Sequence, residues 1–254
     1  MNLSAIPWDF ALILIGLGVL VPWRGAVRVR RLLAQPALTS SQRLSLYAST
    51  IAFQWLIVAV IYWRSVARHL TPADLGLVAS GVWQTLSVAF VFTALLCVNQ
   101  WAGLRKIAHV PADQRGFLFQ FTQKIMPQTF VETFVFIALA LTAGLSEEFI
   151  YRGFVFALFS GVLGSSASAI LSAMVASSTW FAAAHLYQGR RGVATTFVLG
   201  MLFSAVRVWT GNLAPAIMGH VGVDLVVGLY APRALRARHD LAGSENPTNG
   251  AGGS

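Results

Sequence analysis

The stretch GLSEEFIYRG, from Gly144 to Gly153, places two glutamates and an arginine inside a long apolar run. It is preceded by ETFVFIALALTA and followed by FVFALFSGVL, and the whole run covers about residues 128–160. A charge at the centre of a bilayer costs ~2.5–3.5 kcal/mol or more, so charged residues in such runs usually face the interior of a helix bundle and mark a site. The stretch therefore predicts both a membrane-spanning helix and a functional site within it.

The composition of the chain is that of a membrane protein. Hydrophobic residues make up 56% of the 254 residues and charged residues 11%, whereas a soluble domain carries about 25% charged residues. So few charges cannot cover a water-facing surface, so most of the chain must face lipid. The net charge of +9 indicates arginine-rich loops beside anionic lipid and not a nucleic-acid partner. The single cysteine, Cys97, excludes an internal disulfide framework and a Cys-rich metal site.

Seven apolar runs predict an all-α polytopic membrane protein with about seven transmembrane helices, because each run in lipid must close its own backbone hydrogen bonds. The first run is expected to be a retained span, since its arginines follow the apolar residues and do not precede them. The run 128–160 is long for one straight span, and Gly144 and Ser146 interrupt it, so we expect a bend or break there. The runs lie at about 8–23, 45–63, 77–99, 128–160, 164–186, 193–209 and 213–231.

Basic residues between the runs predict the orientation. With seven spans, fourteen of them share one side of the membrane, beginning with the loop 24–44, and Arg64 and Arg68 fall on the other. By the positive-inside rule the N-terminus is then outside and the C-terminus inside. Three parts are expected: residues 1–127 with three spans and an amphipathic surface segment FLFQFTQKI, residues 128–231 as a four-helix core, and residues 232–254 as a disordered cytoplasmic tail.

Helical spacing separates the two adjacent glutamates. Glu148 and Arg152 are four residues apart, so they share a helix face and can pair. Glu147 is turned by about 100° from Glu148 and is left free, which suits a general base. The pair alone could equally be a structural clasp. Asp9 and Glu132 lie near the ends of spans, where they can reach the headgroups, and are not counted as site residues.

Two further pairs with the same spacing carry histidine. Phe181 and His185 lie four residues apart in FAAAH, and His220 and Asp224 in HVGVD. Asp224 can hold the His220 ring in one tautomer. Each pair also has a structural interpretation, with His185 as an interfacial residue and the second pair as a polar contact between packed helices. A free glutamate, two histidines and an aspartate on three separate spans favour a site.

In order along the chain, the three motifs resemble those of the CAAX protease and bacteriocin-processing (CPBP or Abi) family of intramembrane glutamic endopeptidases. The family pattern EExxxR is similar to EEFIYR at Glu147–Arg152, FxxxH to FAAAH at Phe181–His185, and HxxxN or HxxxD to HVGVD at His220–Asp224. The resemblance covers about residues 128–231 and does not extend to the first three spans. Three short motifs in order, each in its own span, are far more specific than any one of them.

The resemblance implies a catalytic site made of Glu147, His185, His220 and Asp224. Glu147 would activate water with help from His185, and His220 and Asp224 would stabilise the oxyanion of the tetrahedral intermediate. An aspartate at position 224 departs from the commoner asparagine, because an anionic side chain is a poorer donor to an oxyanion. Supporting roles would fall to Glu148, Arg152 and Phe181.

The resemblance further implies an enzyme without a cofactor or metal that cleaves a peptide or membrane-protein substrate in a bacterial cytoplasmic membrane. Three alternatives stay open. A zinc-dependent protease would use Glu147, His185 and His220 as ligands and Asp224 behind them, although the usual HExxH spacing is absent. In a non-catalytic scaffold or bacteriocin-immunity protein, the motif residues would make structural contacts only. A proton-coupled transporter is disfavoured because no inverted repeat is evident.

Overall fold

The computed structural model describes residues 5–79, 81–111 and 116–244, and its regular elements within these ranges are all helical. Seven helical segments are long and apolar enough to cross a membrane, which confirms the predicted all-α class and the number of spans. The elements are α1 (Trp8–Ile15), the π-helical turn η1 (Gly16–Leu20), α2 (Val21–Ala34), α3 (Ser40–Ala67), α4 (Val82–Ala108), α5 (Gly116–Ile125), α6 (Phe130–Glu148), the π-helical segment η3 (Phe149–Val155), α7 (Phe156–Leu163), α8 (Ala167–Ala184), the 3-10 turn η4 (Leu186–Gln188), α9 (Gly189–Thr210) and α10 (Ala214–Ser244).

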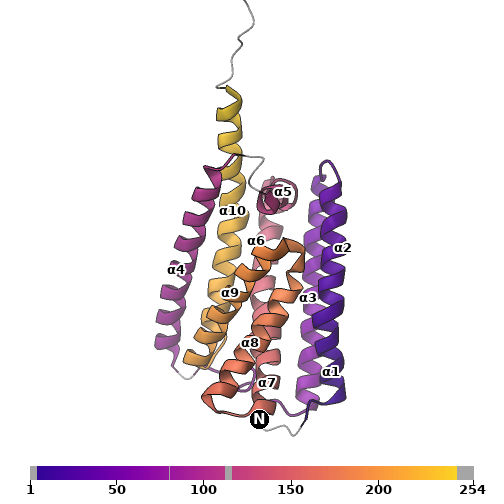
Figure 1. Cartoon of the computed structure of the whole chain (residues 1–254), viewed down its shortest axis with the longest axis vertical. Coiled ribbons are helices and arrows are strands. Elements are labelled where there is room, and N and C mark those ends of the chain that lie inside the picture. The colour runs from indigo at the N-terminus through magenta and orange to yellow at the C-terminus, as the bar shows by residue number, and fades with distance from the viewer. Residues whose placement is uncertain (1–4, 80, 112–115, 245–254) are drawn as a thin grey trace, which may run out of the picture.

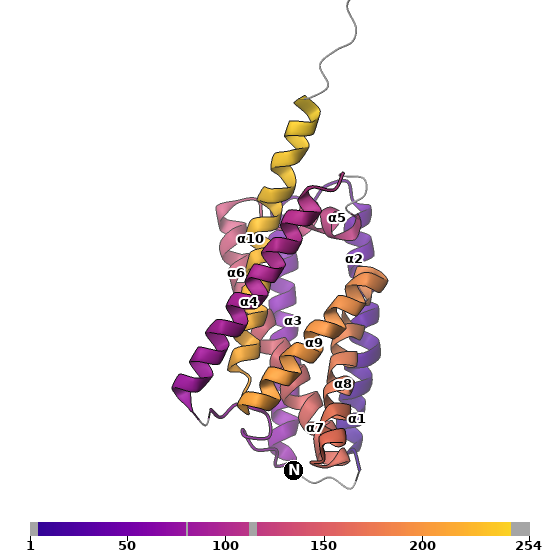
Figure 2. The same cartoon turned by 60° about the vertical axis from the view of Figure 1, so that its left-hand side comes forward.

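The spans run side by side along the long axis of the molecule (Figure 1). The N-terminal end of the described chain lies at one end of the bundle, and α10 leaves it at the other. Turning the molecule shows α4 lying along the outside of α10, while α8 and α9 form a hairpin beside α2 (Figure 2). The helix α5 is seen end-on in Figure 1, so it runs across the bundle and not along it.

The first span is longer than the sequence predicted. We expected it to end near residue 23 and to be followed by an arginine-rich loop over 24–44. Instead, the helix continues through η1 and α2 to Ala34, so Arg24 and Arg28 lie on helical backbone. Continuing the helix satisfies the backbone hydrogen bonds of this segment where lipid offers no partner.

The long fourth span, Phe130–Leu163, stays a single span, but the predicted break at Gly144 and Ser146 is wrong. Both residues lie inside α6, and the irregular backbone comes later, in the π-helical segment η3. Gly144 instead allows close packing on α10, because a Cβ there would lie 2.4 Å from Val221 Cγ2 and 3.2 Å from the Ile217 carbonyl oxygen. Small residues at such crossings let helix backbones approach in membranes.

The last helix also runs further than expected. We predicted a span ending at residue 231 and a disordered tail over 232–254. The helix α10 continues to Ser244, so this prediction is wrong for residues 232–244, and residues 245–254 lie outside the described part of the chain. Pro232 sits within the helix without ending it.

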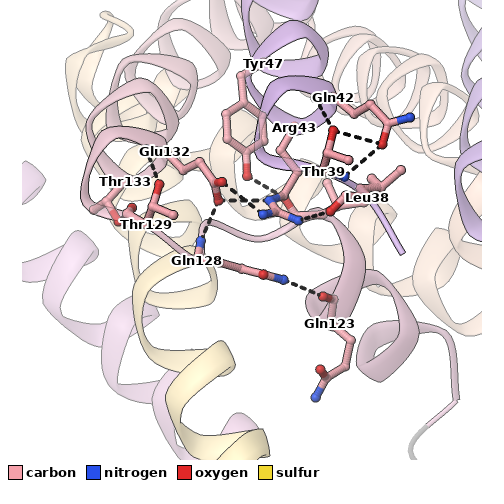
Figure 3. Close-up of polar contacts among 11 residues, drawn as sticks. Leu38, Thr39, Gln42, Arg43, Tyr47, Gln123, Gln128, Thr129, Glu132 and Thr133 are labelled. Atoms are coloured by element: carbon pink, nitrogen blue, oxygen red, sulfur yellow. Dashed lines mark hydrogen bonds and ion pairs between the residues drawn. The ribbon is translucent and has the colours of Figure 1, made fainter. Parts of the chain in front are cut away.

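The amphipathic segment predicted on the membrane surface is the helix α5. It is tied to α2 by Lys124, whose ammonium group donates to the carbonyl oxygens of Leu33 and Gln35. It is tied to α3 by Tyr47, whose hydroxyl donates to the carbonyl of Ile125 (Figure 3). These contacts hold α5 across one end of the bundle, beside the cavity described below.

The sequence suggested that Glu132 and Asp9 contact lipid headgroups. Instead, both are buried in ion pairs with arginines at the two ends of α3. Arg43 donates to the two carboxylate oxygens of Glu132 at 2.9 and 3.0 Å, and both side chains are almost fully buried (Figure 3). Asp9 accepts from Arg64 at 2.6 Å and from Arg68 at 3.0 Å. The two ends of α3 are thus bound to α6 and α1, which places α3 against the core.

Replacing Glu132 by Gln is expected to lower the free energy of unfolding by about 3–5 kcal/mol, because Arg43 is left as an uncompensated buried charge. Unfolding of the purified protein in detergent micelles measures the change. The double variant Glu132→Gln/Arg43→Gln removes both charges and is expected to regain part of the loss. Equal stability of Glu132→Gln and the native chain would show that the pair does not hold α3 to α6.

Candidate active site

One large cavity inside the bundle collects the four residues predicted to be catalytic. It has a volume of about 1250 Å³, and Glu147, His185, His220 and Asp224 all line it. They come from the end of α6, the residue that follows α8, and α10. The structure therefore brings together side chains that are up to 77 positions apart in the sequence, as the three motifs required.

The short hairpin of α8 and α9 explains how His185 lies at the same depth in the bundle as Glu147. By position in the chain His185 ends its helix, whereas Glu147 lies deep inside a 34-residue span. The helix α8 has only 18 residues. In both views the turn between α8 and α9 stops short of α5 and of the far end of α2 (Figures 1 and 2). The end of the short hairpin therefore lies beside the interior of the longer spans.

The carboxylate of Glu148 is shared between two helices. Its Oε1 accepts a hydrogen bond from Arg152 at 2.9 Å, which is the pair predicted from the i, i+4 spacing. The same oxygen accepts from Nδ1 of His220 at 2.8 Å. Both Glu148 and Arg152 are fully buried. This carboxylate therefore links the fourth span to α10 and fixes the orientation of the His220 ring.

Asp224 does not hold the His220 ring by a hydrogen bond, contrary to the expectation from the sequence. Its Oδ2 lies 3.8 Å from Nε2 of His220, beyond hydrogen-bond distance. Because Nδ1 is bound to Glu148, it is Nε2 that faces both Asp224 and Glu147, whose Oε2 is also 3.8 Å away. The two cavity carboxylates therefore act on His220 by charge, and Glu148 positions it.

Aromatic rings surround the buried arginine and the histidines. The guanidinium carbon of Arg152 lies 4.1 Å from the centroid of Phe181 and 5.2 Å from that of Phe203. The ring of Phe203 stacks on His220 at 5.5 Å with planes only 12° apart, and Phe181 meets His185 edge to face at 4.7 Å. Phe181 thus contacts both the arginine and a histidine.

Glu147 is held by a residue that the sequence analysis missed. Gln54 of α3 donates from Nε2 to Oε1 of Glu147 at 2.8 Å. The other oxygen, Oε2, has no hydrogen-bond partner among the described residues. A lone glutamine in the apolar run IAFQWLIVAV was the available signal, but its partner lies 93 positions further along the chain.

His185 is fixed by its own helix. Its Nδ1 lies 2.8 Å from the carbonyl oxygen of Phe181, and since a carbonyl can only accept, Nδ1 carries the proton. In neutral His185 the unprotonated nitrogen is therefore Nε2, which can accept a hydrogen bond from a molecule in the cavity. The site thus offers one partner-free carboxylate oxygen and two histidine Nε2 atoms.

The part of the chain that carries the three motifs is similar to known proteins. Residues 128–226 match the family model described as Type II CAAX prenyl endopeptidase Rce1-like. Over 116 residues, 44% of this chain and 46% of the relative, the chain is 31% identical to the membrane-embedded CAAX protease MroQ of Staphylococcus aureus (strain USA300). The chain thus matches about half the length of this curated relative. No solved protein structure matches the chain.

The matched segment contains every predicted catalytic residue and ends just after Asp224. It does not contain Gln54, which belongs to the part of the chain before the family segment. The resemblance predicted from the motifs is therefore confirmed: residues 128–226 of this multi-pass membrane protein match the Rce1-like CAAX protease model, and the chain is similar to a membrane-embedded CAAX protease.

Proposed function

We propose that the protein is an intramembrane endopeptidase in which Glu147 activates the attacking water. The observation that carries the proposal is that the two carboxylate oxygens of Glu147 have different environments. Gln54 fixes one carboxylate oxygen. The other has no hydrogen-bond partner among the described residues and lies 3.8 Å from His220 Nε2 in a cavity of about 1250 Å³. A positioned carboxylate with one unoccupied oxygen is suited to take a proton from water.

In the proposed reaction, Glu147 accepts a proton from water while the water oxygen forms a bond to the carbonyl carbon of the scissile peptide. The electron pair of the carbonyl moves to its oxygen and gives the tetrahedral intermediate. When the intermediate collapses, the carbon–nitrogen bond breaks and the proton held by Glu147 passes to the leaving nitrogen. The products are a carboxylic acid and an amine, and Glu147 is again ionised.

The histidines have separate parts in this reaction. His185 accepts a hydrogen bond from the water at Nε2, because its Nδ1–H is bound to the Phe181 carbonyl. His220, protonated, donates from Nε2 to the oxyanion, because its Nδ1–H is bound to Glu148. Asp224 lies 3.8 Å from His220 Nε2 and stabilises the imidazolium by its charge. An aspartate therefore serves at this position without donating a hydrogen bond itself.

The proposed reaction uses no metal. Among the described residues, no three His, Cys, Asp or Glu side chains are grouped so that they could hold a metal ion. One candidate ligand, His220, already uses Nδ1 for Glu148, and Gln54 occupies one oxygen of Glu147.

Glu147→Gln is expected to abolish cleavage while leaving the fold intact, because it removes the base and keeps the shape. Glu148→Gln is the matched variant one position along the chain. It is expected to lower the free energy of unfolding by about 3–5 kcal/mol, because Arg152 loses its buried partner. Protein in proteoliposomes is assayed with a pool of internally quenched peptides, and its unfolding is followed in detergent. Normal turnover by Glu147→Gln would rule out the proposed base, and an inactive native protein would favour the scaffold alternative.

The same assay, run with and without chelator and alongside elemental analysis, tests the metal. Activity is expected to be unchanged in chelator, with less than one zinc per chain. Activity that is lost with chelator and returns only when zinc is added would make Glu147 a ligand and not the base.

Gln54→Met is expected to lower kcat by about tenfold or more with little change in KM. The variant keeps the size of the side chain but removes a hydrogen bond to a charged group, worth ~1.5–3 kcal/mol. Gln100→Met is the control, since Gln100 lines the same cavity but is not a hydrogen-bond partner of Glu147. Similar kinetics for the two variants would show that Gln54 does not position Glu147.

We further propose a bacterial cytoplasmic membrane location with the N-terminus outside and the C-terminus inside. The charge distribution supports this orientation. The last turns of α2 and α4, at the end of the bundle where α5 crosses (Figure 1), carry Arg31, Arg105 and Lys106. Arg64 and Arg68 instead pair with Asp9, near the start of the first span.

To test the orientation, Cys97 is replaced and single cysteines are placed at Ser4, Ser40 and Ser244. Intact cells are then treated with a membrane-impermeant thiol reagent. Only the cysteine at position 4 is expected to react, and permeabilised cells show that the other two are reactive once exposed. Labelling at position 244 in intact cells would reverse the assignment of the C-terminus.

A further inference from the structure

More basic than acidic residues line the cavity. From Glu147 and His220 the cavity extends toward the end of the bundle where α5 crosses. Of the described residues that line it, only Glu147 and Asp224 are acidic, and both belong to the proposed site. The basic residues that line it are Arg24, Arg28, Lys106, Arg190 and Arg191.

Two of these arginines are fixed along the inner side of α2, toward α3. Arg28 donates to Ser49 Oγ at 2.6 Å and to Thr50 Oγ1 at 3.4 Å. The guanidinium carbon of Arg24 lies 4.9 Å from the centroid of the Phe53 ring. These partners are uncharged, so they position the two guanidinium groups without neutralising them. By contrast, Arg43 and Arg152 are each paired with a carboxylate.

The register along α3 relates these arginines to the proposed base. Arg28 contacts α3 at Ser49 and Thr50, and Arg24 contacts it at Phe53. Gln54, further along the same helix, holds Glu147. The step from Thr50 to Gln54 is about 6 Å along a helix that rises 1.5 Å per residue. An extended peptide covers this distance in about two residues. A substrate whose scissile bond lies at Glu147 therefore passes the arginines within two or three residues of that bond.

We propose that this site selects peptides that carry an acidic side chain two or three residues from the cleaved bond, bound by Arg28 and Arg24. The proposal rests on the proposed endopeptidase function and names its substrate class. Arginine binds carboxylates through paired N–H donors. A peptide is favoured over an anionic lipid headgroup because both arginines are held against α3 and line the cavity that contains Glu147.

The test measures binding without cleavage. The Glu147→Gln protein, in nanodiscs of phosphatidylcholine only, is immobilised and incubated with a randomised pool of decapeptides with amidated C-termini. Bound peptides are sequenced by mass spectrometry. We expect Asp and Glu to be enriched about tenfold over Asn and Gln, as the loss of one charged hydrogen bond implies. The amidated ends ensure that side-chain carboxylates alone can produce this preference.

Matched variants test whether Arg28 and Arg24 cause the preference for acidic peptides. Arg28→Gln and Arg24→Gln, each added to Glu147→Gln, are expected to remove most of the enrichment. Arg31→Gln removes the same charge from the same helix but at an exposed position that does not line the cavity, and is expected to retain it. Arg28→Glu is expected to shift the preference toward Lys and Arg. Equal enrichment in the Arg28 and Arg31 variants, or no acid preference at all, would overturn the proposal.

Two further arms separate the remaining explanations. With the native protein and the same pool, the cleaved bonds are expected to lie two or three residues from the acidic position. Cleavage without acid preference would refute the inference alone, whereas acid-selective binding without cleavage would refute only the endopeptidase. In nanodiscs that contain phosphatidylglycerol, loss of the peptide preference would identify an anionic lipid as the ligand of the arginines and contradict the inference.

Discussion

The site depends on one buried carboxylate. Glu148 accepts hydrogen bonds from Arg152 and from His220, and the guanidinium group in turn lies on the ring of Phe181. In the interior of a bilayer an ionised group needs such partners, because there is no water to solvate it. The fourth span, α8 and α10 are therefore connected through one side chain. Its neighbour Glu147 is turned by about 100° on the helix, and so it points into the cavity when Glu148 points into the network.

Glycines on α10 complete this arrangement from the other side. A Cβ at Gly222 would lie 2.8 Å from Thr93 and 2.9 Å from the sulfur of Cys97, so α4 packs directly against the backbone of α10. On the opposite face, Gly144 of α6 makes an equally close approach. The helix that carries His220 is thus held between two others with little freedom to slide. The lone cysteine has a packing role in this contact.

Features that depend on local spacing could be predicted from the sequence, and those that depend on long-range contacts could not. The spans followed from continuous apolar runs, and the pairing of Glu148 with Arg152 followed from the helical repeat. No local pattern in the sequence indicated the hydrogen bond between Glu148 and His220. The sequence analysis therefore predicted that Asp224 orients the His220 ring. Gln54 was missed for the same reason. The continuation of the first span through α2 was not predicted, because a segment rich in arginine is typical of a loop between spans. In lipid, however, the backbone favours a helix whatever its side chains.

The pairing of charges distinguishes two kinds of carboxylate in this bundle. Glu132 and Glu148 each have an arginine partner at hydrogen-bond distance, and both hold helices together. Among the described residues, Glu147 and Asp224 have no arginine partner, although basic residues line the same cavity. A carboxylate bound to arginine is stabilised in its ionised form and is a weak base. Arg28 contacts α3 about one turn from Gln54 and is not paired with Glu147, so this carboxylate is able to accept a proton while the cavity still attracts anionic groups.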